Sequence, residues 1–227
     1  MEHRVQKLLS NYGFCSRRKA EELIKQGKVK VNNKVISIGD KASEKDKIYV
    51  GQKLVNKEER VYIMFHKPAD CVTALYDKKY KTVMSYIKIK ERIFPVGRLD
   101  FNTSGLLLLT NDGDFANKIM HPSHEIKKTY LVGLGKEITN LQIIQIEKGV
   151  KLSDGKTSPA KIKKINPTLI EITIHEGKNR IIRRIFKELD IYIRFLKRIK
   201  IGKLDLGYLK EGKWKKLTKK DIESIFG

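Results

Sequence analysis

Cysteine, long apolar runs and acidic residues are all scarce in this sequence of 227 residues. The two cysteines, Cys15 and Cys71, form no CxxC pair, and no histidine lies at metal-ligand spacing from either, which argues against a disulfide scaffold and a zinc site. No apolar run approaches the roughly 20 residues of a membrane span. The N-terminal stretch MEHRVQKLLS lacks the apolar centre of a signal peptide. We therefore expect a soluble, cytoplasmic protein without a membrane partner.

The shortage of acidic residues gives the chain a strong positive charge. There are 49 Lys and Arg residues against 26 Asp and Glu residues, a formal net charge of +23. Such a surface attracts polyanions, of which nucleic acid is the commonest. An AT-rich genome that overuses lysine is the alternative explanation, but that bias ordinarily raises the glutamate content as well, and here glutamate is much less frequent than lysine. The composition therefore favours a nucleic-acid partner.

The first 50 residues show a pattern of two helices followed by a hairpin. Val5, Leu8, Leu9 and Tyr12 repeat at helical spacing, and Ser16 is a suitable N-cap for a second helix. The stretch KVKVNNKVIS alternates around two asparagines, which predicts a β-hairpin, and IYV at 48–50 predicts a further short strand.

Basic residues cluster on this predicted frame. They open the second helix or lie at the start of the hairpin: Arg17, Arg18, Lys19, Lys28 and Lys30. Cations at a helix N-terminus oppose the helix dipole, so three in succession call for another reason. A site for RNA phosphates is one such reason, and a merely solvated helix start is the other.

The polar segment GQKLVNKEER, residues 51–60, lacks an apolar period and predicts a linker between a first domain at 1–50 and a second at 61–227. In the second domain, strands are expected at 61–66, 105–110, 129–134, 161–165, 168–174 and 194–201, and helices at 114–120 and 179–189. We therefore predict an α+β fold, with a mixed, mainly antiparallel sheet flanked by helices. No glycine-rich segment has the spacing of a phosphate-binding P-loop.

One acidic residue lies in an unusual place. Asp100 follows Pro95, Gly97 and Arg98 on a constrained loop, and an apolar strand at 106–109 comes directly after it. A carboxylate beside a buried strand is costly unless a cation partners it, and a partnered carboxylate suits a nucleophile or a general base. A turn aspartate that binds its own backbone is the alternative. The local sequence leaves both interpretations open.

Longer segments resemble known families. The string SRRKAEELIKQGKVKVNNKV resembles the alpha-L RNA-binding module. The strings FHKPADCVT, GRLDFNTSGLLLLTNDG, HPSHEIKKTYLV and EGKNRIIRRIF, in this order, resemble the motifs of the RsuA-type rRNA pseudouridine synthases. The resemblance covers nearly the whole chain. It implies that the chain isomerises a uridine to pseudouridine in structured RNA.

The resemblance also implies roles for individual residues. Asp100 matches the catalytic aspartate, Tyr130 the tyrosine that stacks on the target uracil, and Arg183 the arginine that pairs with the aspartate. Arg98 matches an arginine that holds the place of the flipped nucleotide, and Lys67 matches the lysine of the first motif; both are expected to contact substrate RNA. Because the isomerisation oxidises nothing and transfers no group from a donor, no cofactor is expected.

Two positions depart from the family pattern: Asp70 replaces a usual glycine, and Ile181 replaces a usual glutamine.

The segments HPSHEIKKTY and LKRIKIG look closer to the large-subunit (RluB-like) branch than to the small-subunit branch. We accordingly expect a monomer whose partner is large-subunit rRNA or a subunit precursor. A non-catalytic RNA-binding assembly factor is the first alternative, and a nuclease or glycosylase is the second. A nuclease would need clustered acids with a metal.

Other polar residues receive structural interpretations. His121 and His124 have no nearby third ligand, so we expect a turn or an RNA-facing surface and no metal. Asp112 follows Asn111 and precedes Gly113, which predicts a turn with Asp112 as the N-cap of the next helix.

Overall fold

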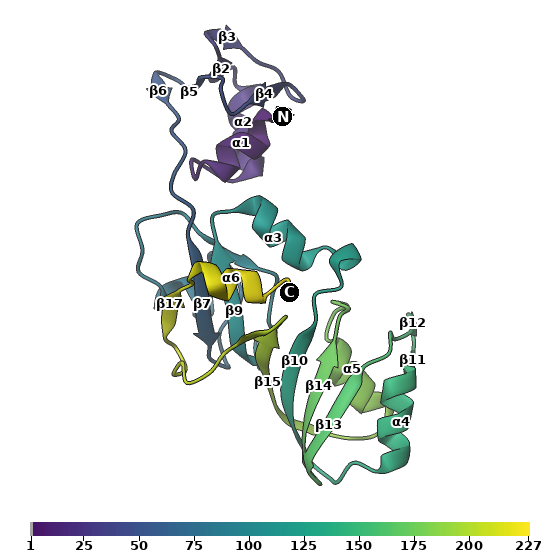
Figure 1. Cartoon of the computed structure of the whole chain (residues 1–227). Coiled ribbons are helices and arrows are strands. Elements are labelled where there is room, and N and C mark those ends of the chain that lie inside the picture. The colour runs from purple at the N-terminus through teal and green to yellow at the C-terminus, as the bar shows by residue number, and fades with distance from the viewer. Residues whose placement is uncertain (1) are drawn as a thin grey trace. The chain divides into compact units, whose positions relative to one another are not determined.

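The computed structural model describes residues 2–227, which form two compact units (Figure 1). Unit 1 runs to Val61 and includes two later segments, 89–94 and 110–114. Unit 2 comprises residues 62–88, 95–109 and 115–227. No helix in the described part of the chain is long and apolar enough to cross a membrane.

Unit 1 contains two helices, a four-stranded sheet in the order β3-β2-β5-β6 and a two-stranded pair β1-β4. Its elements are β1 (Glu2–Arg4), α1 (Val5–Asn11), α2 (Arg17–Lys25), β2 (Val29–Val31), β3 (Lys34–Val35), β4 (Lys41–Ser43), β5 (Ile48–Val50) and β6 (Lys53–Leu54).

Local signals in unit 1 act as the sequence predicted. The predicted helical stripe, Val5 to Tyr12, is buried in one apolar cluster with side chains of α2 and the sheet. Ser16 caps α2, because its Oγ accepts a hydrogen bond from the main-chain N–H of Lys19 at 3.2 Å. Asn32 and Asn33 both have positive φ, 47° and 68°, as a tight two-residue hairpin turn requires.

The segment expected to be a linker begins with a strand. Lys53–Leu54 forms β6, which pairs with β5, and Val55 is buried in the core of unit 1. Gly51 at the turn between the two strands has φ of 61°, a conformation that glycine adopts without strain. Residues without helix or strand therefore begin after Leu54 rather than at residue 51.

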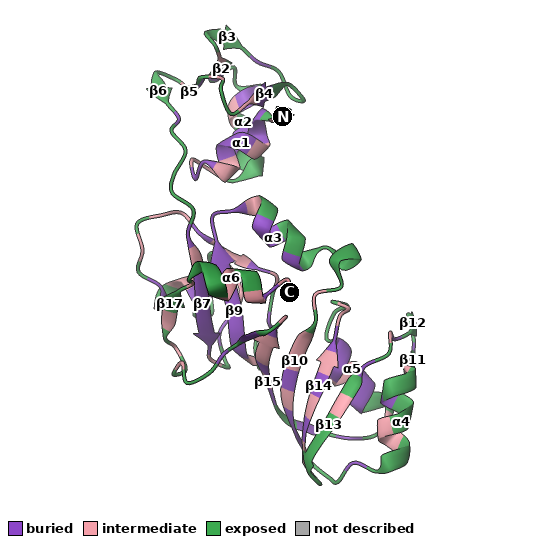
Figure 2. Cartoon of the chain, viewed as in Figure 1, coloured by how far each residue is buried: buried purple, intermediate pink, exposed green. Residues whose placement is uncertain are grey.

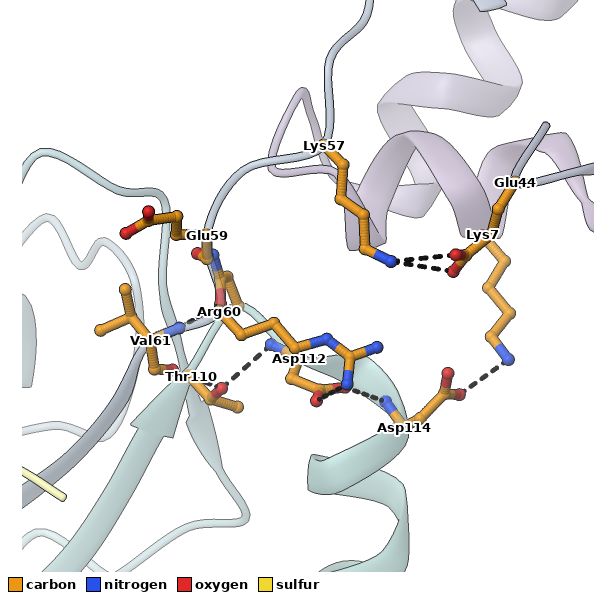
Figure 3. Close-up of polar contacts among 10 residues, drawn as sticks. Lys7, Glu44, Lys57, Glu59, Arg60, Val61, Thr110, Asp112 and Asp114 are labelled. Carbon is orange, nitrogen blue, oxygen red and sulfur yellow. Dashed lines mark hydrogen bonds and ion pairs between the residues drawn. The ribbon is translucent and has the colours of Figure 1, made fainter. Parts of the chain in front are cut away.

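Side-chain contacts tie the rest of this segment to residues 110–114 within unit 1 (Figure 3). Asn111 accepts a hydrogen bond from the N–H of Val61 and donates one to the carbonyl of Glu59, both at 2.8 Å. Thr110 donates to the carbonyl of Val61 at 2.6 Å.

Three ion pairs accompany these hydrogen bonds. Arg60 pairs with Asp112 at 3.1 Å, and Lys7 pairs with Asp114 at 2.7 Å (Figure 3). Lys57 pairs with Glu44 at 3.0 Å. The Asp112 side chain also accepts from the N–H of Asp114 at the start of α3, which confirms the predicted helix cap. Asn111 and Asp112, in the predicted turn, therefore bind residues 59–61 at the end of the connecting segment.

Unit 2 is built on a mixed sheet of nine strands whose main path is β13-β14-β10-β15-β9-β7-β17, with β16 beside β15 and β8 beside β9. Its strands are β7 (Tyr62–Lys67), β8 (Phe94–Val96), β9 (Ser104–Thr110), β10 (Lys128–Leu134), β13 (Lys161–Asn166), β14 (Leu169–Ile174), β15 (Ile193–Ile201), β16 (Leu204–Asp205) and β17 (Trp214–Lys216). β15 and β9 run parallel, and β13, β14, β10 and β15 form an antiparallel series.

The remaining elements are α3 (Gly113–Met120), α4 (Asn140–Lys148), α5 (Ile181–Glu188), α6 (Lys219–Ser224), the short 3₁₀ turns η1 (Val83–Tyr86) and η2 (Pro122–His124), and the strand pair β11 (Lys151–Leu152) and β12 (Gly155–Lys156). The predicted α+β fold with a mixed sheet is confirmed.

The core of unit 2 lies around β9. Leu106, Leu107, Leu108 and Leu109 are fully buried, so β9 has apolar contacts on both faces, and Figure 2 shows the same for much of β7. Gly105 sets the approach of β9 to β15, because a Cβ at this position would collide with the backbone of Arg198. Its φ of 111° also favours glycine. This close pairing places the loop before β9 beside β15.

Candidate active site

One cavity of about 410 Å³ in unit 2 brings together four of the side chains that the sequence singled out. Asp100, Tyr130, Arg183 and Arg98 all line this space, which we call the Asp100 cavity. Its volume lies in the range of small-molecule sites, about 300–1,000 Å³. Apolar side chains such as Ile174 and Ile201 complete the wall, so the cavity offers an apolar surface beside several charges.

Asp100 lies on the turn that leads into β9. Its main-chain carbonyl accepts a hydrogen bond from the N–H of Thr103 at 3.1 Å, and its side chain is 31% exposed. The carboxylate oxygen Oδ2 is 4.0 Å from Nε of Arg183 and 4.0 Å from Nη1 of Arg180. These separations allow attraction without a direct hydrogen bond. The carboxylate therefore faces two cations, and its oxygen atoms remain accessible to a ligand.

Arg183 extends from α5 to the turn that carries Asp100. Its Nη2 donates to the carbonyl of Asn102 at 2.7 Å and to Oγ1 of Thr103 at 3.3 Å. Burial lowers the pKa of Arg183, and the charge of Arg180 lowers it further, whereas Asp100 acts in the opposite direction. The guanidinium group thus braces the turn and presents charge to the carboxylate at the same time.

Lys67, at the end of β7, is fully buried and does not line the cavity. Its ammonium group donates to the main-chain carbonyls of Pro68 (2.8 Å), Thr103 (2.9 Å), Asp100 (3.2 Å) and Phe101 (3.2 Å). Burial is the largest influence on the pKa of Lys67 and lowers it to about 8. Because the side chain has no exposed surface, it cannot contact RNA in this conformation, and the structure places it behind the Asp100 turn.

The first-motif loop holds the same turn from another side. The Thr73 hydroxyl donates to the carbonyl of Leu99 at 2.8 Å and accepts from the N–H of Leu99 at 3.3 Å. Asp70 has a positive φ of 56°, a left-handed conformation that glycine adopts freely and aspartate tolerates better than most residues. The departure from glycine at this position therefore preserves the bend. Ile181, the other departure, is buried and adds an apolar side chain to the cavity wall.

Tyr130 comes from the middle of β10 and is largely buried. Its cross-strand neighbours are Ile172 on β14 and Arg198 on β15. The guanidinium carbon of Arg198 lies 6.0 Å from the centre of the tyrosine ring, at the limit of a cation–π contact. The aromatic ring is therefore fixed by the sheet and lines the Asp100 cavity.

Comparisons with known proteins agree with this geometry. The model of the family described as RNA pseudouridylate synthase matches residues 61–188, more than half of the chain. The chain belongs to this family. The S4 domain model matches residues 3–48, so the synthase also carries an N-terminal RNA-binding S4 domain. These findings confirm the predicted RsuA-type architecture and the assignment of the chain as an isomerase.

Individual relatives share nearly the full length of the synthase. The ribosomal large subunit pseudouridine synthase B of Bacillus subtilis is 44% identical and aligns over 98% of this chain and 95% of its own length. A dual-specificity RNA pseudouridine synthase of Escherichia coli is 34% identical over 98% of this chain and 78% of its own. The crystal structure of a pseudouridylate synthase superposes with a TM-score of 0.74 at 31% identity, covering 98% and 99% of the two chains.

The predicted RNA-binding residues of the S4 domain are all exposed: Arg17, Arg18, Lys19, Lys28 and Lys30. Lys19 also forms an ion pair with Glu22 at 2.9 Å, so part of its charge is compensated locally. The other four have no ion pair within the described residues and are available to phosphate groups.

Sequence reasoning missed four cations of the Asp100 cavity: Lys128, Lys178, Arg180 and Arg198. Lys128 precedes Tyr130 by two residues, so the alternation of a strand would have placed it on the same face. Arg198 carried no local signal, because only the pairing of β15 with β10 and β9 brings it to the cavity.

Within residues 2–227, no group of three or more His, Cys, Asp and Glu side chains is arranged to hold a metal ion. The rings of His121 and His124 lie 6.0 Å apart, and Nδ1 of His121 is hydrogen-bonded to the hydroxyl of Ser123 at 2.7 Å. The structure thus places His121 at the N-cap of the short turn η2 and His124 at its last residue, with their rings in contact and His121 bonded to the serine.

Proposed function

We propose that this synthase converts one uridine of ribosomal RNA, most favourably large-subunit RNA, to pseudouridine, with Asp100 as the catalytic carboxylate. The observation that carries the proposal is the position of Asp100, whose carboxylate lines the same cavity as Tyr130 and faces Arg183. The name of the Bacillus subtilis relative, which refers to the large ribosomal subunit, supports this choice of RNA.

The reaction breaks the bond between N1 of uracil and C1′ of ribose and forms a bond between C5 and C1′. The base turns between the two steps, C5 loses its proton, and N1 gains one. Asp100 can act by attacking C1′, or by taking a proton from C2′ to give a glycal; each route needs one accessible carboxylate. Nothing is oxidised and no donor is consumed, so the proposal includes no cofactor.

The other residues bind and position the nucleotide. Removing a base from its stack costs a few kcal/mol, and stacking on an aromatic ring such as Tyr130 recovers about 1–3 kcal/mol. Arg183 holds the Asp100 turn and its charge faces the carboxylate. Arg98 is exposed at the cavity, where it can bind RNA or hold the place vacated by the flipped nucleotide.

Lys67 and the exposed cations of the S4 domain act outside the reaction centre. Lys67 is a positioning residue in this proposal, because its buried ammonium group holds the carbonyls of the Asp100 turn instead of reaching RNA. The exposed cations of the S4 domain bind the RNA backbone. The boundaries of the two domains and the monomeric state remain predictions.

The test is release of tritium from C5 of uracil in large-subunit rRNA, with wild type and Asp100→Asn compared in parallel. Wild type should release tritium, and Asp100→Asn should release none while binding the RNA with nearly unchanged affinity. Mapping of the modified base would then identify the uridine. If wild type failed to release tritium from free rRNA and from subunit precursors, the chain would be an RNA-binding factor. If Asp100→Asn lost RNA binding to the same degree as activity, Asp100 would be structural.

A further inference from the structure

A buried arginine and a half-buried lysine lie beside Tyr130 in the Asp100 cavity, and the roles proposed above use neither of them. Lys128 is two residues before Tyr130 on β10, and Arg198 is the cross-strand partner of Tyr130 on β15. The register of the two strands shifts between Thr129 and Tyr130, so that Lys128 pairs with Ile201 while Tyr130 pairs with Arg198. Lys128, Tyr130 and Arg198 all line the cavity.

The guanidinium group of Arg198 is held in place and incompletely bonded. The residue is only 3% exposed, and its Nε donates to the carbonyl of Leu106 at 2.7 Å. Its Nη2 is buried and has no hydrogen-bond partner among residues 2–227. A buried donor without an acceptor costs free energy, so a ligand that supplies an acceptor is favoured here.

Lys128 adds a second positive charge to the same wall. Its ammonium group donates to the carbonyl of Ile126 at 3.1 Å, which uses one of its three N–H bonds. Burial lowers the pKa of Lys128 to about 8, and repulsion by Arg198 contributes in the same direction. In the described part of the chain, no carboxylate lies within ion-pair distance of either cation. Arg198 and Lys128 therefore offer hydrogen-bond donors without acceptors and positive charge without a paired carboxylate.

We propose that Arg198 and Lys128 bind the carbonyl oxygens of the target uracil and stabilise the negative charge that the base acquires when its bond to ribose breaks. The inference rests on the proposed function and adds a leaving-group site to it. When the N1–C1′ bond breaks, its electron pair stays on uracil and spreads from N1 to O2 and O4. Donors that are already oriented toward this charge lower the barrier without reorganisation.

The site also accounts for the fate of the detached base. C1′ becomes bonded to Asp100 in the direct route, or becomes part of a glycal after Asp100 removes the C2′ proton. In both routes uracil remains as an anion until C5 bonds to C1′. This step breaks the bond between C1′ and Asp100 in the direct route, and in the glycal route Asp100 returns the proton to C2′; C5 then loses its proton and N1 gains one. Arg198, Lys128 and the Tyr130 ring would together retain this anion while it turns.

The experiment compares uridine with 5-fluorouridine at the target position of an rRNA substrate, in single-turnover reactions that follow loss of the starting nucleoside. Fluorine withdraws electrons and makes the base a better leaving group, so cleavage depends less on the cations. Lys128→Met should lower the rate about 100-fold with uridine and about 10-fold or less with 5-fluorouridine, with RNA affinity almost unchanged. Lys128→Arg, which keeps the charge, should restore most of the rate.

Arg198→Gln provides a second variant, which loses the charge but retains hydrogen-bonding groups and should show the same dependence on the substrate. Lys200→Met is the matched control: Lys200 also lies on β15, forms an ion pair with Asp205 at 3.1 Å and does not line the cavity. Equal losses with both substrates in the Lys128 and Arg198 variants would assign these residues a structural role and overturn the inference. If wild type were inactive on uridine, the proposed function itself would fail.

A separate feature lies on the exposed loop between β7 and η1. Tyr80 is 45% exposed and packs edge-to-face against Phe101, which is 37% exposed, with ring centres 5.0 Å apart. The Asp77 carboxylate accepts from the N–H groups of Lys79 and Tyr80 at 2.8 and 2.9 Å, and Phe101 is held through its carbonyl by Lys67. These two rings therefore form a supported aromatic surface, in which Phe101 directly follows Asp100 in the chain.

The geometry points to a stacking surface for an unpaired RNA base next to the target uridine. Lys79 lies 5.2 Å from the centre of the Tyr80 ring, and the exposed Lys78 adjoins it, so cations for the RNA backbone flank the rings. Aromatic side chains beside cations are the usual arrangement for single-stranded nucleic acid. Phe101 follows Asp100 directly in the chain and does not line the cavity, so the proposed surface would take a base adjacent to the flipped nucleotide and not the target itself.

Binding in the Asp100→Asn background tests this surface without turnover. Tyr80→Ala should weaken binding of an rRNA fragment about tenfold and reduce quenching of 2-aminopurine beside the target, whereas Tyr80→Phe should keep both. Tyr208→Ala removes a fully exposed tyrosine elsewhere and is the matched control. Equal affinity and quenching in Tyr80→Ala and Tyr208→Ala would overturn the proposal.

Discussion

Lys67 and Asp100 are joined through the backbone: the buried ammonium group of the lysine donates to the main-chain carbonyl of the aspartate at 3.2 Å. The same group bonds the carbonyls of Phe101 and Thr103, so one side chain of β7 organises the turn that carries the proposed catalytic carboxylate. The carboxylate itself stays directed to the cavity. The position of Asp100 is therefore set from behind by a residue that does not line the site.

Lys67→Met should destabilise the protein and misplace Asp100. Methionine fills a similar volume, but the buried carbonyls of the turn lose their shared donor, which we expect to cost about 2–4 kcal/mol in the free energy of unfolding. Urea unfolding measures this loss, and tritium release should fall along with it. Lys78→Met, an exposed lysine of the following loop, should change stability by less than about 0.5 kcal/mol. Similar stabilities for the two variants would contradict the bracing role.

The cations of the S4 domain should determine how RNA binding depends on salt. Joint replacement of Arg17, Arg18 and Lys28 by alanine should weaken rRNA binding and reduce the slope of log affinity against log salt by about two to three, since each phosphate contact contributes about 0.7–0.9. Filter binding over a range of salt concentrations provides the measurement.

The matched control removes the same charge elsewhere. Lys216, Lys219 and Lys220 are exposed near the C-terminus, and their joint replacement by alanine lowers the net charge equally. A much smaller change in slope is expected for this variant. The RNA-binding assignment of the S4 residues would be refuted by equal changes in both triple variants, because the effect would then reflect overall charge alone.

Burial of Lys128 predicts a pH-dependent stability. The pKa of Lys128 is about 8 in the folded protein, against about 10.4 for an unfolded lysine. Below pH 8 both states hold the proton, so the full cost of burying the charge is present. Between these pH values the unfolded state binds more protons than the folded state, so the stability of wild type rises with pH.

Lys128→Met removes this contribution. The free energy of unfolding of wild type minus that of the variant should therefore increase from pH 8 to pH 10, with a slope below about 1.4 kcal/mol per pH unit, the limit for one proton. Urea unfolding of both proteins across this range measures the difference. A difference independent of pH would show that Lys128 stays charged in the folded state throughout the range.

Local features of the fold were predictable because their signals are local. Helical spacing from Val5 to Tyr12, the cap at Ser16 and the paired asparagines each depend on residues within one or two turns of the chain. The apolar strand at 106–109 was equally clear. The strand within residues 51–60 was harder to predict, because β6 has only two residues and forms by pairing with β5. A strand this short has no period of its own.

The candidate site was predictable where long motifs identified the residues, and the structure places Asp100, Tyr130, Arg183 and Arg98 in one cavity. Lys67 was expected to face RNA, because its position in the motif says nothing about burial. Lys128 and Arg198 were not singled out, since a cation within a strand is ordinarily exposed.

The sequence by itself determined the family, the order of the elements and the acid that the motif carries, because each depends on residues that are neighbours in the chain. Only the tertiary structure decided which cations share the cavity with Asp100. That outcome depends on β15 pairing with β10 on one side and with β9 on the other, and on Gly105 allowing the backbone of Arg198 to approach. Contacts between strands so distant in sequence follow from packing of the whole sheet, which no local pattern encodes.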